Sequence, residues 1–444
     1  MQGGADQNVT APVNSAGLVG WQVESSGRGT LKLIASCLAT TALCTWIVIH
    51  SRIYKRKKHR LPHKAALWLK TIVAPEFIAV EAAQEWTQAR RVMEKCSKLT
   101  GGQFQMVHSL YIGMFGLRYR TSCGTRVLWP NQFIWLLEEG LLDWQRHVEW
   151  GMSRECTKDK GNADTTANVL TLAQVSWFVA QSIMRRAHNL PLAPLESMTS
   201  SYIPLFAVAY AYWWIKPKDI ETPSEIDLPQ MSDNQAAVFE SLAVDGRFDD
   251  EATAEQQSLW GIWALTPRTF EKEADLRASE EEEKQYQHKQ DHFEKHVEKC
   301  SVSDCRAPDH KVPSFPKLIK KLKLSHWDPD LYHSRLLWPV CCLAGISFPA
   351  LHLISWNSVF PTLVETWLWR ASAIASLVGM LIFMQFDVVV VSWKDPLMLV
   401  KVLSPAVYFV TRIILLAGAF AALRASDPAI YETYVVSTYW VHVI

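Results

Sequence analysis

Residues 31–60 read LKLIASCLATTALCTWIVIHSRIYKRKKHR, and this stretch decides the fold class. Its first part, residues 31–49, is apolar apart from Lys32 and is long enough to cross the roughly 30 Å hydrocarbon core of a bilayer. The basic residues that follow favour the cytoplasmic side of a membrane, so we expect the N-terminus on the opposite side. The sequence therefore predicts an integral membrane protein whose first span is an uncleaved anchor.

Further apolar segments extend this prediction to the whole chain, which has 444 residues and is 49% hydrophobic. Five of them have the length and composition of membrane spans: residues 169–184, 198–215, 336–356, 366–386 and 397–423. A sixth, residues 65–86, is apolar but also carries Lys70 and several carboxyl groups. It is consistent with a poor span, a re-entrant helix or a helix in the interface. We predict an all-α, polytopic membrane protein with six to seven transmembrane helices.

The distribution of charge divides the chain into five regions. They are an extracellular or lumenal tail (1–30), a first membrane region (31–215), a charged and net acidic cytoplasmic helical segment (216–335), a second membrane region (336–423) and a C-terminal tail (424–444). Six crossings with residues 65–86 embedded leave Arg185, Arg186 and Arg424 on the outer side, against the positive-inside rule. A seventh crossing at residues 65–86 would export the basic cluster before residue 336, a larger violation.

Ionisable residues inside the apolar segments are the candidate functional residues, because burying a charge in lipid is costly. Glu76 and Glu81 lie five residues apart in residues 65–86, and a desolvated carboxyl can serve as a general acid. Arg412 lies mid-span and needs an acidic partner, for which Glu76 and Glu81 are the candidates. Arg370 and Asp387 are further structural or transport candidates, although Arg370 lies near a span end and can extend to the headgroups.

Other signals are weaker or point to surface contacts. Asn8 begins the sequon Asn8-Val9-Thr10 and is a glycosylation candidate. A basic stretch before residue 336 predicts contact with anionic lipid through Lys317, Lys320, Lys321 and Lys323. The nine cysteines form no disulfide framework. No motif predicts a metal site, a cofactor or a nucleic-acid partner, and a lipophilic small molecule is the expected ligand class if there is one.

Several short motifs together resemble a group of multi-pass membrane proteins of filamentous fungi. They are Gly20-Trp21 with residues 27–30 (GRGT), Ala74-Pro75-Glu76, residues 108–117 (HSLYIGMFGL), and Trp213-Trp214 with Lys216-Pro217 and Asp219. The resemblance covers roughly residues 20–220 well and the later spans loosely. It implies a fungal source and a place in specialised metabolism, and it implies no particular activity.

The sequence leaves two classes of function open. One is a membrane-embedded acid/base enzyme, such as a cyclase or isomerase, that acts on a lipophilic specialised metabolite with Glu76 or Glu81 as proton donor. The other is a non-catalytic carrier, or a scaffold whose cytoplasmic segment binds partners. An endomembrane such as the endoplasmic reticulum is the favoured location.

Overall fold

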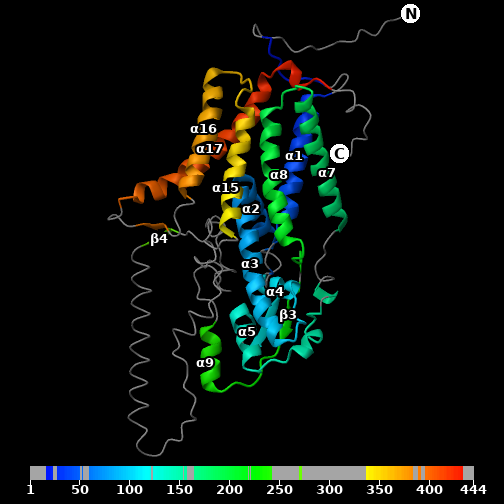
Figure 1. Cartoon of the computed structure of the whole chain (residues 1–444), viewed down its shortest axis with the longest axis vertical. Coiled ribbons are helices and arrows are strands. Elements are labelled where there is room, and N and C mark those ends of the chain that lie inside the picture. The colour runs from blue at the N-terminus through cyan, green and yellow to red at the C-terminus, as the bar shows by residue number, and fades with distance from the viewer. Residues whose placement is uncertain are drawn as a thin grey trace, which may run out of the picture.

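A computed structural model describes much of the chain and shows it as two joined parts (Figure 1). The described residues are 17–23, 28–50, 53, 60–121, 124–153, 155–157, 165–218, 220, 222–242, 270–272, 337–383, 389–391 and 396–433. A helical bundle occupies the upper half in Figure 1, and a small cluster of helices and strands lies below it. The predicted dominance of helix is confirmed in these residues.

Six long helices of the bundle correspond to the predicted apolar segments. They are α1 (Thr30–Val48), α7 (Thr165–Ala187), α8 (Pro194–Trp213), α15 (Leu337–His352), α16 (Leu363–Phe383) and α17 (Met398–Ala421). Short 3-10 helices continue α15 and α17, namely η3 (Leu353–Ser355) and η4 (Ala422–Arg424). A further one, η5 (Pro428–Ile430), follows η4 along the chain. Helix α8 packs against α1 and α15, and α16 packs against α17. Each helix lies within a few residues of its predicted bounds.

Fewer helices than predicted meet the requirements for a membrane span on length and composition alone. Two stretches of the described residues do so, Thr30–Val48 and Ala406–Arg424, and Cys342–Ser355 is a shorter apolar helix. Helix α15, with 16 described residues, is too short to qualify, and α8 and α16 carry the charged residues Glu196, Glu365 and Arg370. By length and composition, the described residues support two membrane spans rather than the six to seven predicted from the sequence.

The sequence predicted one continuous helix at residues 65–86, and this was wrong, because the structure has two helices there. Helix α2 (Arg60–Val73) ends at Ala74, and α3 (Pro75–Leu99) begins directly after it. Ala74 is completely buried and has φ −142° and ψ 68°, which is not helical. Proline disfavours the helical conformation of the residue before it but is well suited to the first turn of a new helix, so Pro75 places the break.

The two helices form a hairpin that enters the bundle and leaves it on the same side. Along α2, the Trp68 indole N–H donates to Thr45 Oγ1 near the end of α1 (2.8 Å), and the Ile72 carbonyl accepts from the Tyr202 hydroxyl in the middle of α8 (2.5 Å). Along α3, Glu85 has returned to the end of α8, where its carboxylate accepts from the Trp213 indole (2.8 Å). This matches the re-entrant alternative for residues 65–86.

The lower part, here named the α/β cluster, was not predicted to contain strands. It consists of α4 (Met106–Gly113), β1 (Leu117–Thr121), β2 (Gly124–Val127), α5 (Pro130–Glu138), η2 (Trp144–Val148), β3 (Ser224–Ile226) and α9 (Asp233–Ser241). Strand β1 pairs antiparallel with β2 and parallel with β3. A second, isolated pair joins β4 (Phe270–Lys272) to β5 (Val389–Val391) in parallel.

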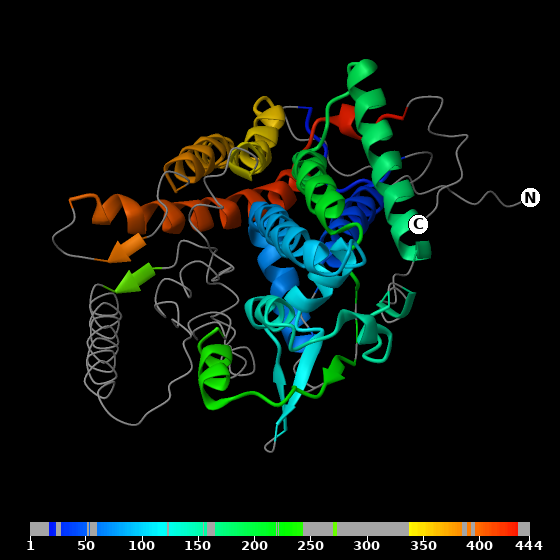
Figure 2. The same ribbon diagram turned by 60° about the horizontal axis from the view of Figure 1, so that its bottom comes forward.

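The elements of the α/β cluster share one hydrophobic core. This core includes residues from the start of the segment 216–335, which the sequence predicted to be a separate charged region. Phe104, Tyr111 and Phe133 are fully buried members of this core, and Ile226 and Phe239 belong to the same cluster. The Tyr111 hydroxyl also accepts from the backbone N–H of Ser224 at 3.0 Å. Residues 220–242 therefore belong to this core, and the end of α3 joins it through Val92 and Cys96. Figure 2 shows the same cluster from below.

We predict that two neighbouring glycines respond oppositely to alanine. A Cβ at Gly116 would lie 2.5 Å from the Tyr111 carbonyl oxygen, whereas one at Gly113 meets nothing within 4 Å. Gly116→Ala should overpack the core and cost about 1–3 kcal/mol. Gly113→Ala, at the end of α4, should be neutral or stabilise by up to about 1 kcal/mol. Hydrogen exchange of residues 104–142 in the full chain measures both, and equal protection in the two variants would contradict the packing.

Candidate functional site

A buried ion pair joins the tip of the α2–α3 hairpin to α17. Arg412 Nη2 lies 2.9 Å from Glu76 Oε1 and 3.0 Å from Oε2, and the two residues are 5% and 1% exposed. Glu76 stands in the first turn of α3, where the helix dipole favours a negative charge. The pairing of Arg412 with one of the two acids suggested by the sequence is thus confirmed.

Aromatic groups complete the surroundings of the guanidinium. Arg412 Nε donates to the Tyr408 hydroxyl at 3.0 Å, one turn earlier on α17. The Phe348 ring of α15 lies against its other side, with 3.4 Å between the guanidinium carbon and the ring centroid. A desolvated cation gains from such a ring face, so α15, α17 and α3 are held together at one point.

The ion pair limits what Glu76 can do chemically. Both carboxylate oxygens accept from the same guanidinium nitrogen, and Glu76 is not among the residues that line the two cavities described below. Glu81, the second proposed proton donor, lies 3.6 Å from Lys70 of α2. The geometry gives both acids cationic partners from neighbouring elements and does not favour either as a general acid, which must reach the group that it protonates.

The third acid of α3 continues the pattern. Glu85 accepts hydrogen bonds from Lys216 and from the Trp213 indole, both at the end of α8. Lys216 Nζ also lies 4.5 Å from the centroid of the Trp213 ring. Glu76, Glu81 and Glu85 therefore tie one helix to α17, α2 and α8. Sequence reasoning did not identify Lys70 and Lys216 as partners, although their positions at the edges of apolar segments were a signal.

A small cavity lies beside the ion pair. It measures about 20 Å³ and is lined by polar groups from three helices, Arg412, Tyr202 and His352, together with apolar side chains that include Ile72 and Ile413. Arg412 Nη1 is buried and has no hydrogen-bond partner among the described residues. A void of this size holds one water or one small polar group. A second cavity of about 10 Å³ is also lined by Tyr202.

The other predicted site residues are not brought to this place. Arg370 Nε donates to the Trp356 carbonyl at 2.9 Å near the far end of the bundle. Asp387, Asn8 and the basic cluster Lys317, Lys320, Lys321 and Lys323 lie outside the described residues. Within the described residues, no group of three or more histidine, cysteine, aspartate or glutamate side chains is placed to hold a metal ion.

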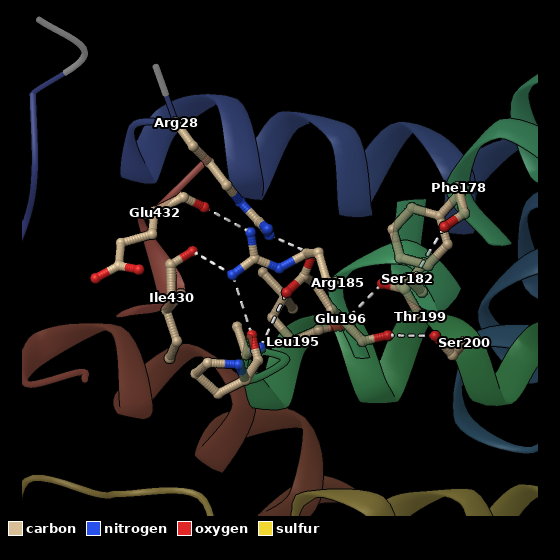
Figure 3. Close-up of polar contacts among 12 residues, drawn as sticks. Arg28, Phe178, Ser182, Arg185, Leu195, Glu196, Thr199, Ser200, Ile430 and Glu432 are labelled. Carbon is tan, nitrogen blue, oxygen red and sulfur yellow. Dashed lines mark hydrogen bonds and ion pairs between the residues drawn. The ribbon is translucent and has the colours of Figure 1, made fainter. Parts of the chain in front are cut away.

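A second polar network closes the end of the bundle opposite the α/β cluster, here called the distal end (Figure 3). Arg185 of α7 is 2% exposed and donates to four backbone carbonyls. They belong to Pro191 (3.1 Å), Ala429 (3.1 Å), Ile430 (2.9 Å) and Glu432 (2.8 Å). Arg28 forms an ion pair with Glu196 beside it. The segments before α1, before α8 and after α17 are thus joined by buried charge-assisted hydrogen bonds.

We predict that removing one partner of the buried ion pair destabilises the protein, whereas replacing both partners costs much less stability. Glu76→Gln leaves the Arg412 charge buried without its counter-charge and should cost about 3–5 kcal/mol. Glu76→Gln combined with Arg412→Met should recover much of that loss. Tryptophan fluorescence during unfolding of the purified full chain measures both variants.

The control for this prediction is an exposed pair on the same helix. Arg90 and Glu94 are 51% and 54% exposed, so Arg90→Ala should change stability by less than about 1 kcal/mol. If Glu76→Gln costs no more than Arg90→Ala, the pair is not buried as described.

Comparisons with known proteins give one match. The profile of a family of unknown function (DUF8562) matches residues 7–294, which include Glu76 and the α/β cluster but not Arg412. Comparison with curated proteins and with solved structures gives no match. Because the matched region covers more than half of the sequence, the chain belongs to the DUF8562 family.

Proposed function

We propose that the chain is a multi-pass membrane protein with six spans, α1, α7, α8, α15, α16 and α17, and the re-entrant hairpin α2–α3. Its bundle exposes large apolar side chains over several helices, which is typical of a lipid-facing surface. Examples are Leu31, Leu38, Val169, Leu170, Ile183, Leu343, Leu363, Val364, Ile374, Val378, Leu399, Leu403, Val410 and Ile413. The α/β cluster exposes Val148 as its one such residue within the described segments.

The distal network supports this topology by accounting for two of the three arginines that violate the positive-inside rule, Arg185 and Arg424. Arg185 is enclosed by backbone carbonyls, and Arg424 forms an ion pair with Glu365. Arginines held in this way can be accommodated at the outer end. A re-entrant hairpin adds no crossing, so the chain before α2 and after α3 stays on one side. That side carries the basic cluster at residues 52–64 and is therefore the cytoplasm.

Within this topology, we infer that the protein is a carrier of a small molecule rather than an embedded acid catalyst. The observation that carries the inference is Arg412 of α17, a mid-bundle charge that meets the tip of the α2–α3 hairpin, lines a cavity and has Nη1 without a hydrogen-bond partner among the described residues. Broken helices and buried charges at mid-membrane depth are typical of transport sites. An embedded enzyme would need a carboxyl that points into its pocket, which neither Glu76 nor Glu81 does.

The cargo and location follow from the sequence as further proposals. The resemblance to fungal membrane proteins favours a lipophilic specialised metabolite and an endomembrane such as the endoplasmic reticulum. The N-terminal tail would then be lumenal and available for glycosylation at Asn8. Anionic lipid at Lys317, Lys320, Lys321 and Lys323 would bind on the cytoplasmic side.

Metabolite distribution after gene deletion separates a carrier from an enzyme. Loss of a carrier should leave the total amount of a product unchanged while moving it between membrane, cytosol and medium. Loss of an enzyme should remove a product and accumulate its precursor. A strain with Glu76→Gln and Arg412→Met at normal protein level should reproduce the deletion, because the site has lost its charge. Precursor accumulation in both strains would overturn the carrier proposal.

We predict that the two ends of the bundle label from opposite sides of sealed microsomes. Cys156 of the α/β cluster is exposed, so a membrane-impermeant maleimide should label it directly. Val359→Cys, at a 41% exposed position of the distal end, should label only after detergent is added. Cys96 serves as an internal control, because burial raises the pKa of its thiol to about 12 and keeps it unreactive. Labelling of both sites from one side would refute the topology.

A further inference from the structure

The cavity beside Arg412 has a definite pattern of hydrogen-bonding groups. Arg412 Nη1 supplies unpaired N–H donors. His352 donates from Nδ1 to the Phe348 carbonyl at 2.8 Å, because that carbonyl can only accept, so in the neutral ring Nε2 carries the lone pair. The Tyr202 hydroxyl gives its proton to the Ile72 carbonyl, which leaves its oxygen able to accept. The residues that line the cavity therefore offer one donor nitrogen and two acceptor atoms.

The position of the cavity shows how a ligand could approach. Ile413 lines it and is 61% exposed, so the cavity borders the outer surface of the bundle between the hairpin tip and α17. Its other lining residues, apart from the three polar ones, are apolar. A polar head group fits the space of about 20 Å³, and an attached hydrocarbon chain would leave past Ile413 into the surrounding lipid.

We propose that this cavity binds the hydroxyl head group of a lipophilic alcohol that enters from the bilayer. A hydroxyl accepts from Arg412 Nη1 and donates to His352 Nε2 or to the Tyr202 oxygen, which satisfies both kinds of group at once. A carboxylate would bring a second negative charge close to Glu76, and an ether or a ketone would have no proton for His352 or Tyr202. The inference rests on the proposed membrane carrier and names the chemical class of its cargo.

Binding of 1-dodecanol to the purified full chain in nanodiscs tests the proposal. The matched probe is its methyl ether, which partitions into the bilayer similarly and accepts a hydrogen bond but cannot donate one. We expect the alcohol to bind about tenfold more tightly, the equivalent of roughly 1.4 kcal/mol and within the range of one hydrogen bond. His352→Phe keeps the ring and removes the acceptor, so it should reduce the preference for the alcohol severalfold.

A second variant separates the site from general effects on the fold. Ile413→Trp fills the mouth of the cavity from an exposed position and should abolish binding of both probes. Ile374→Trp, at a 46% exposed position on α16 that does not line this cavity, is its control and should bind like wild type.

Three results would overturn the inference. They are equal binding of alcohol and ether to wild type, as expected for a cavity that holds water only, an unchanged preference in His352→Phe, and unchanged binding in Ile413→Trp. Any of them, together with the expected microsome labelling and metabolite redistribution, would refute the alcohol site while leaving the topology and the carrier proposal intact. Labelling from one side would refute the topology and this inference together.

Discussion

The ion pair between Arg412 and Glu76 determines where the α2–α3 hairpin ends inside the bundle. Pro75 breaks the helix, but a break alone leaves the hairpin free to slide along its neighbours. The pair removes that freedom, because Glu76 must meet a guanidinium that Tyr408 and Phe348 already hold in place. Burying two charges is costly, and close geometry with additional hydrogen bonds is what offsets the cost. The ion pair thus fixes the depth of the hairpin tip, and the contacts of Tyr202 and Glu85 hold the rest of the hairpin at the same depth.

Helix α3 carries that constraint out of the bundle. Its first half contributes Phe77, Val80 and Ala83 to the bundle, and its last turns contribute Val92 and Cys96 to the core of the α/β cluster. At 25 residues it is roughly 37 Å long and passes through both parts without a break. A shift of the hairpin tip would therefore reach the α/β cluster through one rigid element, which is what coupling between the bundle site and the α/β cluster requires.

The sequence was most informative about features that depend on local apolar composition and on the free-energy cost of burying a charge. Long apolar runs located the six bundle helices, and the expense of an unpaired charge made a partner for Arg412 predictable. It was least informative about structure that forms by contact between segments far apart in the sequence. Strands β1, β2 and β3 are short, and β3 lies far from β1 and β2 in the sequence. No local pattern of residues therefore predicted the sheet. Pro75 is the signal for the break at Ala74, but the mixture of apolar residues, lysine and glutamate around it was interpreted as one continuous embedded helix.

The three carboxylates of α3 are better explained by specificity than by stability. Each meets a cation from a different element, and replacing such pairs with apolar groups of similar volume is often neutral for stability. The pairs favour one position of the hairpin over the alternatives, because a displacement by one turn would leave several charges unpaired in the apolar bundle. Arg412 differs from the other two cations in one respect: its pairing with Glu76 leaves Nη1 unused beside a cavity. A purely structural pair has no need of that surplus donor, and this excess over what folding requires is the reason for proposing Arg412, rather than Glu76, as the functional group of the site.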